Sequence, residues 1–528
     1  MATFAMQTAF ADDPYWTGSA NDLKLGTAEN WSTGSVPTSG NVVISLTEAA
    51  TLTNDEGSQF APTAITFSDS SALVTISGEK SIEGLLAITN SASVHHVFNC
   101  PVAFADNTDA DLTASSSESN YIKYPGGMTM YKPMKSSSIG WGWVYLSGQI
   151  TITADIEDWS SYQTIDMLQL SDSGTKLVIS HSVEVKGVHN FRMDEGTMVE
   201  IQGDYTVSSP STVKYGSNNY AADSFAYVNK GIIKATGKIA TGAADVRFGA
   251  GASSSSGAMA ANKFDAPHRF IMTCFQNSGG SLVVGEGGMT ASNNGDFYLQ
   301  ASANKSSRLV GTIRPSANFA VNATIRSASG RGLNGKVVFN TTDYYDSSIG
   351  RTITVNNAVT DAVIDAVGTG TLLFNVSGGT SLGLWAANSC TVAVNSNCQP
   401  GTGLVVLSDS AALKVAESGT VTLGGELRMN SSNASLEFNF TNRATAPKLI
   451  IPTLNFVSGV STVNVKISAD DDRRPVAGEY VIASSTSGNF TGKTINVTAP
   501  HWVESVTVNS SGELVCKVKP SGLIISIH

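Results

Sequence analysis

The 528-residue sequence predicts an all-β protein whose body is a single-stranded right-handed parallel β-helix, or β-solenoid, with capped ends. Three observations lead to this prediction: short apolar alternating runs, loose joins between these runs, and a low content of charged residues. An array of β-sandwich domains is the structural alternative, because strand runs alone do not separate the two architectures.

The alternating runs recur along the chain and have the composition of strands. They are rich in β-branched residues and are bounded by Gly, Ser, Asn or Asp. Examples are 41–45, 72–78, 176–180, 198–203, 336–340 and 371–376. Amphipathic helical patterns of useful length are missing, and the best helical candidate, 262–275, contains Pro267.

The joins between runs favour a solenoid over hairpins. They are clearest in 403–440, where apolar pieces alternate with small polar turns. Hairpins would favour two-residue Asn-Gly or Asp-Gly turns. The joins at 408–410 and 417–420 are looser and suit corners at which the chain bends without reversing. Coils of roughly 20 residues, each stacking its strands on those of the next coil, fit this pattern.

Composition limits the partners. Charged residues make up 14% of the chain, against about 25% in ordinary soluble domains. The net charge is −11 and no basic run occurs, so we expect no nucleic-acid partner. No apolar run reaches the roughly 18 residues that a membrane-spanning helix needs, so we expect no membrane-spanning segment.

The N-terminus indicates export. Residues 1–11 read MATFAMQTAFA, and the small-x-small ending at Ala9 and Ala11 precedes an acidic pair. We interpret 1–11 as a residual signal-peptide-like segment, with a disordered N-terminal stretch as the alternative. The expected location is extracellular, at a bacterial cell surface.

The five cysteines fit no zinc template, because no CxxC pair and no suitably spaced histidine accompanies them. Cys390 and Cys398 either form a disulfide across one turn, which an oxidising compartment would permit, or remain buried free thiols.

Two parts of the chain resemble a known family. Tyr15-Trp16-Thr17-Gly18, Asn30-Trp31, Gly34, Val36-Pro37 and 41–44 resemble the opening of autotransporter-type β-helix passengers, with Asn41 where the family usually has Asp. The runs at 65–67, 74–78, 82–90 and 97–102 are similar to the coils of the autotransporter-associated β-strand repeat. The segments 478–482, 488–490, Trp502 and 514–518 resemble the closing part of those proteins.

The resemblance implies the organisation of the chain. We expect an N-terminal cap at 12–45, a parallel β-helix at 46–469 and a C-terminal capping β segment at 470–528. Trp16, Trp31 and Pro37 are the expected capping residues, since an open solenoid end exposes strand edges that must be covered. Autotransporters continue into a translocator barrel, whereas this chain ends at 522–528 without one, so we expect the passenger architecture alone.

The sequence contains no recognisable catalytic constellation, so we expect no enzyme, no catalytic residues, no cofactor and no metal site. His95 and His96 are adjacent and would point to opposite faces of a strand. The acidic stretch 106–111 has oxygens for calcium but lacks a complete loop pattern, so we predict a solvated turn. Asp343 and Asp346 form a carboxylate pair for which the sequence indicates no partner on a neighbouring coil.

One aromatic patch is a candidate for glycan stacking. Trp141, Trp143 and Tyr145 alternate with Gly142 and Val144, so on a strand the three rings share one face. Such a row stacks on sugar faces when exposed. The alternative is that the rings pack inside the solenoid or seal an inserted loop.

Together these observations predict a secreted or surface-displayed β-solenoid that acts as an adhesin, surface-layer or extracellular matrix structural protein. The possible partners are polysaccharide, a host or neighbouring cell surface, and further copies of the chain through its faces or ends. The alternative is a polysaccharide-active β-helix enzyme, a lyase or glycoside hydrolase. That alternative requires several acidic or basic side chains to converge on one groove.

Overall fold

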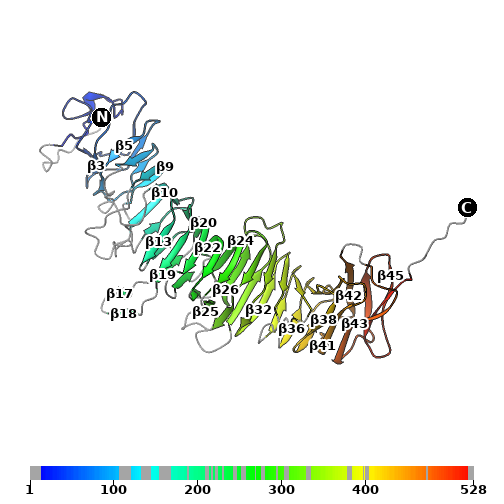
Figure 1. The fold of residues 1–528 in the computed structure, drawn as a ribbon. Coiled ribbons are helices and arrows are strands. Elements are labelled where there is room, and N and C mark those ends of the chain that lie inside the picture. Colours follow the sequence, from blue (N-terminus) through cyan, green and yellow to red (C-terminus); the bar gives the residue numbers. More distant parts are fainter. Residues whose placement is uncertain are drawn as a thin grey trace, which may run out of the picture. The chain divides into compact units, whose positions relative to one another are not determined.

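The computed structural model is all-β, with large sheets of mostly parallel strands (Figure 1). Within the part of the chain that it describes there is no α-helix, and the short 3-10 turn η1 spans Ala28–Asn30. The described residues are 13–105, 121–131, 144–153, 168–186, 189–208, 213–215, 218–220, 224–228, 231–241, 246–250, 257–267, 269–274, 280–292, 295–301, 309–328, 335–376, 383–396, 398, 403–470 and 474–520.

The strands fall into two compact units, Met1–Ala261 and Asn262–His528. The strands of the first unit are β1 (Asn41–Ile44), β2 (Ala50–Thr53), β3 (Ala64–Phe67), β4 (Val74–Ser77), β5 (Ile82–Leu85), β6 (Ala87–Asn90), β7 (Val97–Phe98), β8 (Val102–Phe104), β9 (Lys123–Met130), β10 (Val144–Ile152), β11 (Leu168–Leu170), β12 (Lys176–Ile179), β13 (Val183–Lys186), β14 (His189–Met193), β15 (Met198–Ile201), β16 (Tyr205–Ser208), β17 (Val213–Tyr215), β18 (Asn218–Tyr220), β19 (Ser224–Val228), β20 (Ile232–Thr241) and β21 (Val246–Ala250). The unit boundary falls within β22 (Ala258–Ala266).

The strands of the second unit continue the same pattern. They are β23 (Phe270–Cys274), β24 (Ser281–Ala291), β25 (Phe297–Ala301), β26 (Leu309–Pro315), β27 (Phe319–Asn322), β28 (Ile325–Ala328), β29 (Gly335–Asn340), β30 (Thr352–Val355), β31 (Val359–Thr360), β32 (Ala362–Val367), β33 (Thr371–Phe374), β34 (Gly383–Ala386), β35 (Thr391–Val394), β36 (Leu404–Leu407), β37 (Ala412–Val415), β38 (Gly419–Thr422), β39 (Glu426–Met429), β40 (Ser435–Phe440), β41 (Pro447–Phe456), β42 (Thr462–Ala469), β43 (Gly478–Ser487), β44 (Thr494–Thr498), β45 (Val503–Val508) and β46 (Leu514–Val518).

Strands pair in parallel with strands one repeat further along the chain, and β38 with β41 is one such pair visible in Figure 1. In the first unit β1, β3 and β6 stack in register. In the second unit β30, β33, β35, β37, β40 and β42 form a longer ladder. One residue of each strand continues an apolar column in that ladder: Ile353, Leu372, Val392, Leu413, Leu436 and Val465.

This column explains why the sequence folds in this way. Its six side chains are all at most 1% exposed. The strands alternate buried and half-exposed positions, as the period of two requires. Burying an aliphatic side chain contributes about 1.5–3 kcal/mol, so each added strand extends one continuous core. The hydrophobic core therefore runs along the ladder.

A row of asparagines lies at the ends of four strands that pair in order, β27, β30, β33 and β35. The Nδ2 of Asn356 donates to Oδ1 of Asn322 at 2.7 Å, and Asn375 donates in the same way to Asn356 at 3.1 Å. Asn395 donates to Asn375 at 2.7 Å. The members are separated by 34, 19 and 20 residues. An amide carries both a donor and an acceptor, so identical side chains can bond in series along the stack.

The segment before β1 covers the open edges of the first strands. The N–H of Trp16 donates to the carbonyl of Val43 at 2.9 Å, and the N–H of Val43 donates to the carbonyl of Pro14 at 2.9 Å. The N–H of Leu25 donates to the carbonyl of Thr53, in β2, at 2.9 Å. These backbone groups would otherwise offer an edge for pairing.

The chain reverses direction near its C-terminal end. Strand β43 pairs with β41 in parallel and with β46 in antiparallel orientation, and β45 also pairs with β46 in antiparallel orientation. The ring of Trp502 packs edge-on against Phe440 at 5.7 Å. The segment 478–518 therefore differs in topology from the parallel strands before it.

Candidate functional site

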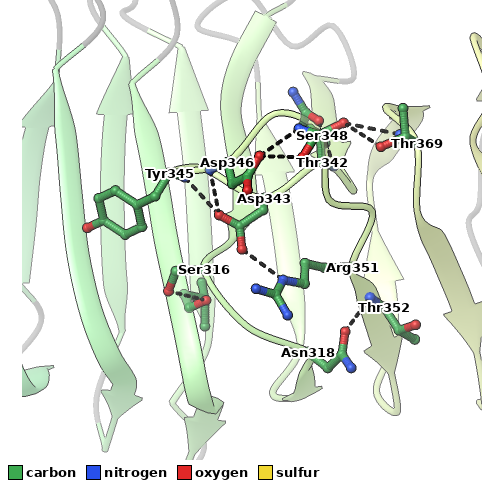
Figure 2. Close-up of polar contacts among 12 residues, drawn as sticks. Ser316, Asn318, Thr342, Asp343, Tyr345, Asp346, Ser348, Arg351, Thr352 and Thr369 are labelled. Carbon is green, nitrogen blue, oxygen red and sulfur yellow. Dashed lines mark hydrogen bonds and ion pairs between the residues drawn. The ribbon is translucent and has the colours of Figure 1, made fainter.

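An organised polar loop, 341–351, joins β29 to β30 (Figure 2). The side chain of Asp343 lies at its centre and is only 3% exposed. Its Oδ1 accepts hydrogen bonds from the N–H groups of Tyr345, at 2.8 Å, and Asp346, at 3.0 Å. Its Oδ2 accepts from Nε of Arg351 at 2.8 Å. The sequence indicated no partner for this carboxylate pair on a neighbouring coil, and the partner of Asp343 lies eight residues later in the same loop.

The protonation of Asp343 is fixed by its neighbours. Burial alone would raise the pKa of this carboxyl, but the hydrogen bond from Arg351 and the two backbone N–H bonds outweigh burial and hold the pKa below its usual range. A carboxylate offers about four acceptor positions, and three are occupied by these bonds. Asp343 therefore organises the loop and has no proton to donate at neutral pH.

The second carboxylate of the loop is also engaged in its own turn. Oδ1 of Asp346 accepts from the N–H of Ser348 at 2.9 Å and from its hydroxyl at 2.6 Å. These bonds hold the pKa of Asp346 below its usual range. Glycosidases pair an ionised carboxylate with a carboxylic acid whose pKa is raised. Since both pKa values are lowered here, the pair lacks the acid of such a mechanism.

The loop presents two tyrosines in different environments. Tyr344 is half-buried, with Cζ of Arg314 at 4.9 Å from its ring centroid. Tyr345 is 58% exposed, and its ring points away from Asp343 (Figure 2). The two rings meet edge to face at 5.1 Å. The hydrogen bonds of Asp343 thus hold the backbone of Tyr345 in place. The exposed ring of Tyr345 is suited to stacking on a sugar face.

Loop 341–351 approaches the turn 368–370 closely because glycine occupies two positions of that turn. A Cβ at Gly370 would collide with the carbonyl oxygen of Arg351. Gly368 has φ +104°, and a Cβ there would lie 2.6 Å from Oγ1 of Thr342. Oγ1 of Thr342 accepts the N–H of Thr369 at 3.1 Å. The turn 368–370 therefore supports the loop from the following repeat.

The aromatic patch expected from the sequence is described in part. Trp141 and Trp143 lie outside the described residues. Tyr145 is half-buried, and its ring stacks on Tyr121 with centroids 5.7 Å apart and planes inclined by 10°. Tyr121 is 7% exposed. Tyr145 therefore packs against a neighbouring ring, and its role in glycan stacking stays a prediction.

A polar network lies beneath this tyrosine pair. Asp172 accepts from the hydroxyl of Ser147 at 2.6 Å and from that of Tyr121 at 3.2 Å, and it pairs with Lys123 at 3.0 Å. Burial and the charge of Asp172 raise the pKa of Tyr121 to about 12. Burial would raise the pKa of Asp172, but Ser147 and Lys123 lower it overall. Asp172, the acceptor, is therefore ionised, and Tyr121, the donor, is protonated, as is typical of a structural hydrogen-bond network.

The expected capping residues are all buried. Trp16 is 3% exposed and Trp31 is 2% exposed, and their rings meet edge to face at 5.3 Å. Trp31 also stacks on Phe60 at 5.3 Å, and its Nε1 donates to the carbonyl of Leu25 at 2.9 Å. Pro37 is buried as well. These side chains form the buried part of the segment that covers β1 and β2.

The adjacent histidines differ in environment. His96 is fully buried, stacks on Phe67 at 4.0 Å and accepts the N–H of Val74 on Nδ1 at 3.0 Å. Burial, followed by the neighbouring His95, lowers the pKa of His96 to about 4. His95 is half-buried beside Tyr121. The acidic stretch 106–111 lies outside the described residues, and the described part of the chain contains no cluster of metal-ligating side chains.

Both candidate disulfide cysteines are free thiols. Cys390 and Cys398 are buried and unpaired, as are Cys100 and Cys516. Burial raises the pKa of Cys390 to about 11. The protonated thiol is a poor nucleophile and a poor metal ligand, so Cys390 acts as a packing residue.

The exposed residue Trp385 was not predicted from the sequence. Trp385 lies on β34 and is 40% exposed. In register, its neighbours are Asp365 on β32 and Val406 on β36. Leu384 and Ala386 are buried on either side. Residues 383–386 read Gly-Leu-Trp-Ala, without a polar alternation that would mark the outward face. Once Leu384 is known to be buried, the period of two requires Trp385 to point outward.

The fold and these sites define an all-β protein with parallel ladders, outward aromatic residues and carboxylates engaged in structural bonds. No helix within the described ranges has the length and apolar character needed to cross a membrane. No protein-family model matches the chain, and no curated protein matches it either.

Proposed function

We propose that both units are stretches of β-solenoid and that the protein is a secreted or surface-displayed adhesin, surface-layer or extracellular matrix component of a bacterium. The observation that carries this proposal is the in-register parallel ladder from β30 to β42 with its continuous apolar column. Such a stack places outward side chains in regular rows at a spacing of about 4.8 Å.

Two features support a solenoid over β-sandwich domains. Sandwiches are built from antiparallel strands with hairpin or Greek-key connections. The described ladders are mostly parallel, with antiparallel pairing at β17–β18 and in 478–518. The asparagine row bonds equivalent corners of successive repeats, which a stacked repeat produces directly.

The N-terminal segment supports a capping role for Trp16, Trp31 and Pro37. It hydrogen-bonds to β1 and β2, which also pair with β3 and β4. The buried tryptophan pair gives this segment a small core of its own. A capped end suits a protein that must stay unaggregated outside the cell.

The outward aromatic residues support contact with glycans. Tyr345 and Trp385 are 58% and 40% exposed. A single ring contributes about 0.5–1.5 kcal/mol, so each site alone binds weakly. Many copies on a surface would multiply the effective strength. Trp141, Trp143 and Tyr145 remain part of this proposal as a further stacking face.

The test combines location, turnover and retention. Antibodies should label intact cells of the source bacterium, and external protease should remove the protein. The purified chain should bind immobilised polysaccharide without cleaving it. Tyr345→Ala combined with Trp385→Ala should reduce retention, whereas Leu86→Ala, at a side chain 41% exposed, should not. Release of shortened saccharides, or a purely internal location, would overturn the proposal.

A further inference from the structure

A buried carboxylate in the second unit is held between two arginines. The side chain of Asp296 precedes β25 and is 6% exposed. Its Oδ1 is 2.8 Å from Nε of Arg269, and its Oδ2 is 2.9 Å from Nε of Arg326. Nη2 of Arg269 also lies 3.5 Å from Oδ2, so the carboxylate holds both guanidiniums at once.

The cluster is assembled by the ladder β23–β25–β28. Phe270, Phe297 and Ile325 stack in register, so Arg269 and Asp296 precede equivalent positions and Arg326 follows the third. Arg326 lies directly opposite Tyr298 on the same row. The Cζ of Arg269 is 5.5 Å from the ring centroid of Tyr298. Three successive repeats thus contribute to one group of side chains.

Two guanidiniums share one carboxylate in this cluster. The carboxylate is buried, whereas the side chains of Arg269 and Arg326 are 43% and 51% exposed. Both guanidiniums are thus partly exposed and held by a buried carboxylate, so part of the cost of ordering these two long side chains is already met in the free protein.

We propose that Arg269, Arg326 and Tyr298 form a binding site for the anionic groups of an acidic polysaccharide, either carboxylate or sulfate. A guanidinium binds such groups through a planar fork of N–H donors. The half-buried tyrosine beside it offers a ring edge to the sugar that carries the anion. The choice of a saccharide as carrier rests on the proposed function, while the anion site itself rests on the cluster.

The first unit provides a matched control. Glu200 pairs with Lys176 at 3.1 Å and with Lys234 at 4.0 Å, so it has the same two-to-one charge ratio. Ammonium groups are point charges without the planar fork. Arg326→Gln and Lys234→Gln each remove one positive charge. A difference in polymer binding between the two variants is therefore due to the guanidinium site and not to the net charge.

The experiment measures binding of the full chain to dextran sulfate, alginate and neutral dextran at low and at physiological salt. Sulfate or carboxylate polymer should bind and neutral dextran should not, and the preferred polymer identifies the anion. Arg326→Gln should weaken binding about fivefold, as loss of one exposed charge contact predicts. Lys234→Gln should leave binding unchanged. Arg326→Lys, which keeps the charge, should bind between the wild type and Arg326→Gln.

Several outcomes would overturn this inference. They are no binding of either acidic polymer, equal loss in Arg326→Gln and Lys234→Gln, or equally tight binding of single-stranded DNA, which would indicate a general polyanion surface. Hydrogen exchange of β25 and β28 checks that the variants are folded. Binding of the acidic polymers is measured independently of cell-surface labelling. The proposed function can therefore fail while the anion site is confirmed, and the anion site can fail while the proposed function is confirmed.

Discussion

Asp343 and His96 are both buried titratable residues, and their surroundings keep them in opposite states. Asp343 receives three hydrogen bonds and stays ionised. Nδ1 of His96 accepts a hydrogen bond from the N–H of Val74, and the ring stays neutral, since a proton on Nδ1 would break that bond. Each residue links its protonation to the stability of the repeat around it.

The ion pair in loop 341–351 gives the first prediction. Arg351→Ala should destabilise the loop by about 3–5 kcal/mol, because it leaves the charge of Asp343 buried and unpaired. The double variant Arg351→Ala and Asp343→Asn should recover part of this loss. Local hydrogen exchange of 341–351 measures both effects. Equal protection in the wild type and in Arg351→Ala would show that the pair contributes nothing.

The same carboxylate sets a pH dependence. The pKa of Asp343 is lower in the folded protein than in the unfolded chain, so its stabilising contribution is present above about pH 4 and is lost as the pH falls through the folded value. Wild-type loop protection should decline below pH 4. In Asp343→Asn this decline should be absent, and a matching decline in the variant would assign it to other groups.

His96 gives the second pH prediction, with a different window. Its pKa is about 4 when folded against 6.5 as a model value. The unfolded chain binds more protons between these values, so stability is constant above pH 6.5 and falls toward pH 4, by at most about 3 kcal/mol. His96→Gln keeps an acceptor for Val74 and should lack this slope. Hydrogen exchange of β4 in both proteins, between pH 4.5 and 7, provides the comparison.

At the scale of elements, the strands were predictable from local pattern. The runs at 176–180 and 371–376 correspond to β12 (Lys176–Ile179) and β33 (Thr371–Phe374). Period-two burial and β-branched residues are local signals, so one sequence suffices to find them. Asn356, Asn375 and Asn395 are separated by 19 and 20 residues, close to the spacing of about 20 that the sequence predicts, whereas Asn322 and Asn356 are separated by 34 residues.

The contacts between repeats could not be predicted. Arg269 and Asp296 are 27 residues apart, and no fixed period would bring them together because loop length varies between repeats. Trp385 was missed for a related reason, since its exposure depends on which neighbours cover its face. Arg351 was missed because it lies across a loop from Asp343, where neither strand nor helix periodicity applies.

The contact between two turns gives a prediction at this scale. Gly370→Ala should destabilise the second unit by about 1–3 kcal/mol, because the added Cβ would collide with the backbone of Arg351. Gly57→Ala, where a Cβ would meet open space, should change stability by less than about 0.5 kcal/mol. Urea denaturation followed by tryptophan fluorescence and by local exchange distinguishes them. Equal effects would mean that the close approach relaxes at no cost.

At the scale of the whole molecule, cooperativity should follow from repeat contacts. Trp31→Ala removes a buried ring that touches Trp16 and Phe60, at a local cost of about 3–5 kcal/mol. In a stacked array each repeat contacts mainly its neighbours, so β1–β3 should lose exchange protection while β30–β42 keep it. Loss of protection along the entire chain in one step would contradict the solenoid.

The asparagine row also bears on how such a chain changes over generations. Asn356, Asn375 and Asn395 stand at 19- and 20-residue intervals, and their side-chain amides bond in series. Recombination that deletes or duplicates one interval would rejoin an asparagine to an asparagine and an inward aliphatic residue to another. Gain or loss of one such interval would therefore require no new kind of contact along this row, so the length of the ladder could change while its chemistry stayed the same.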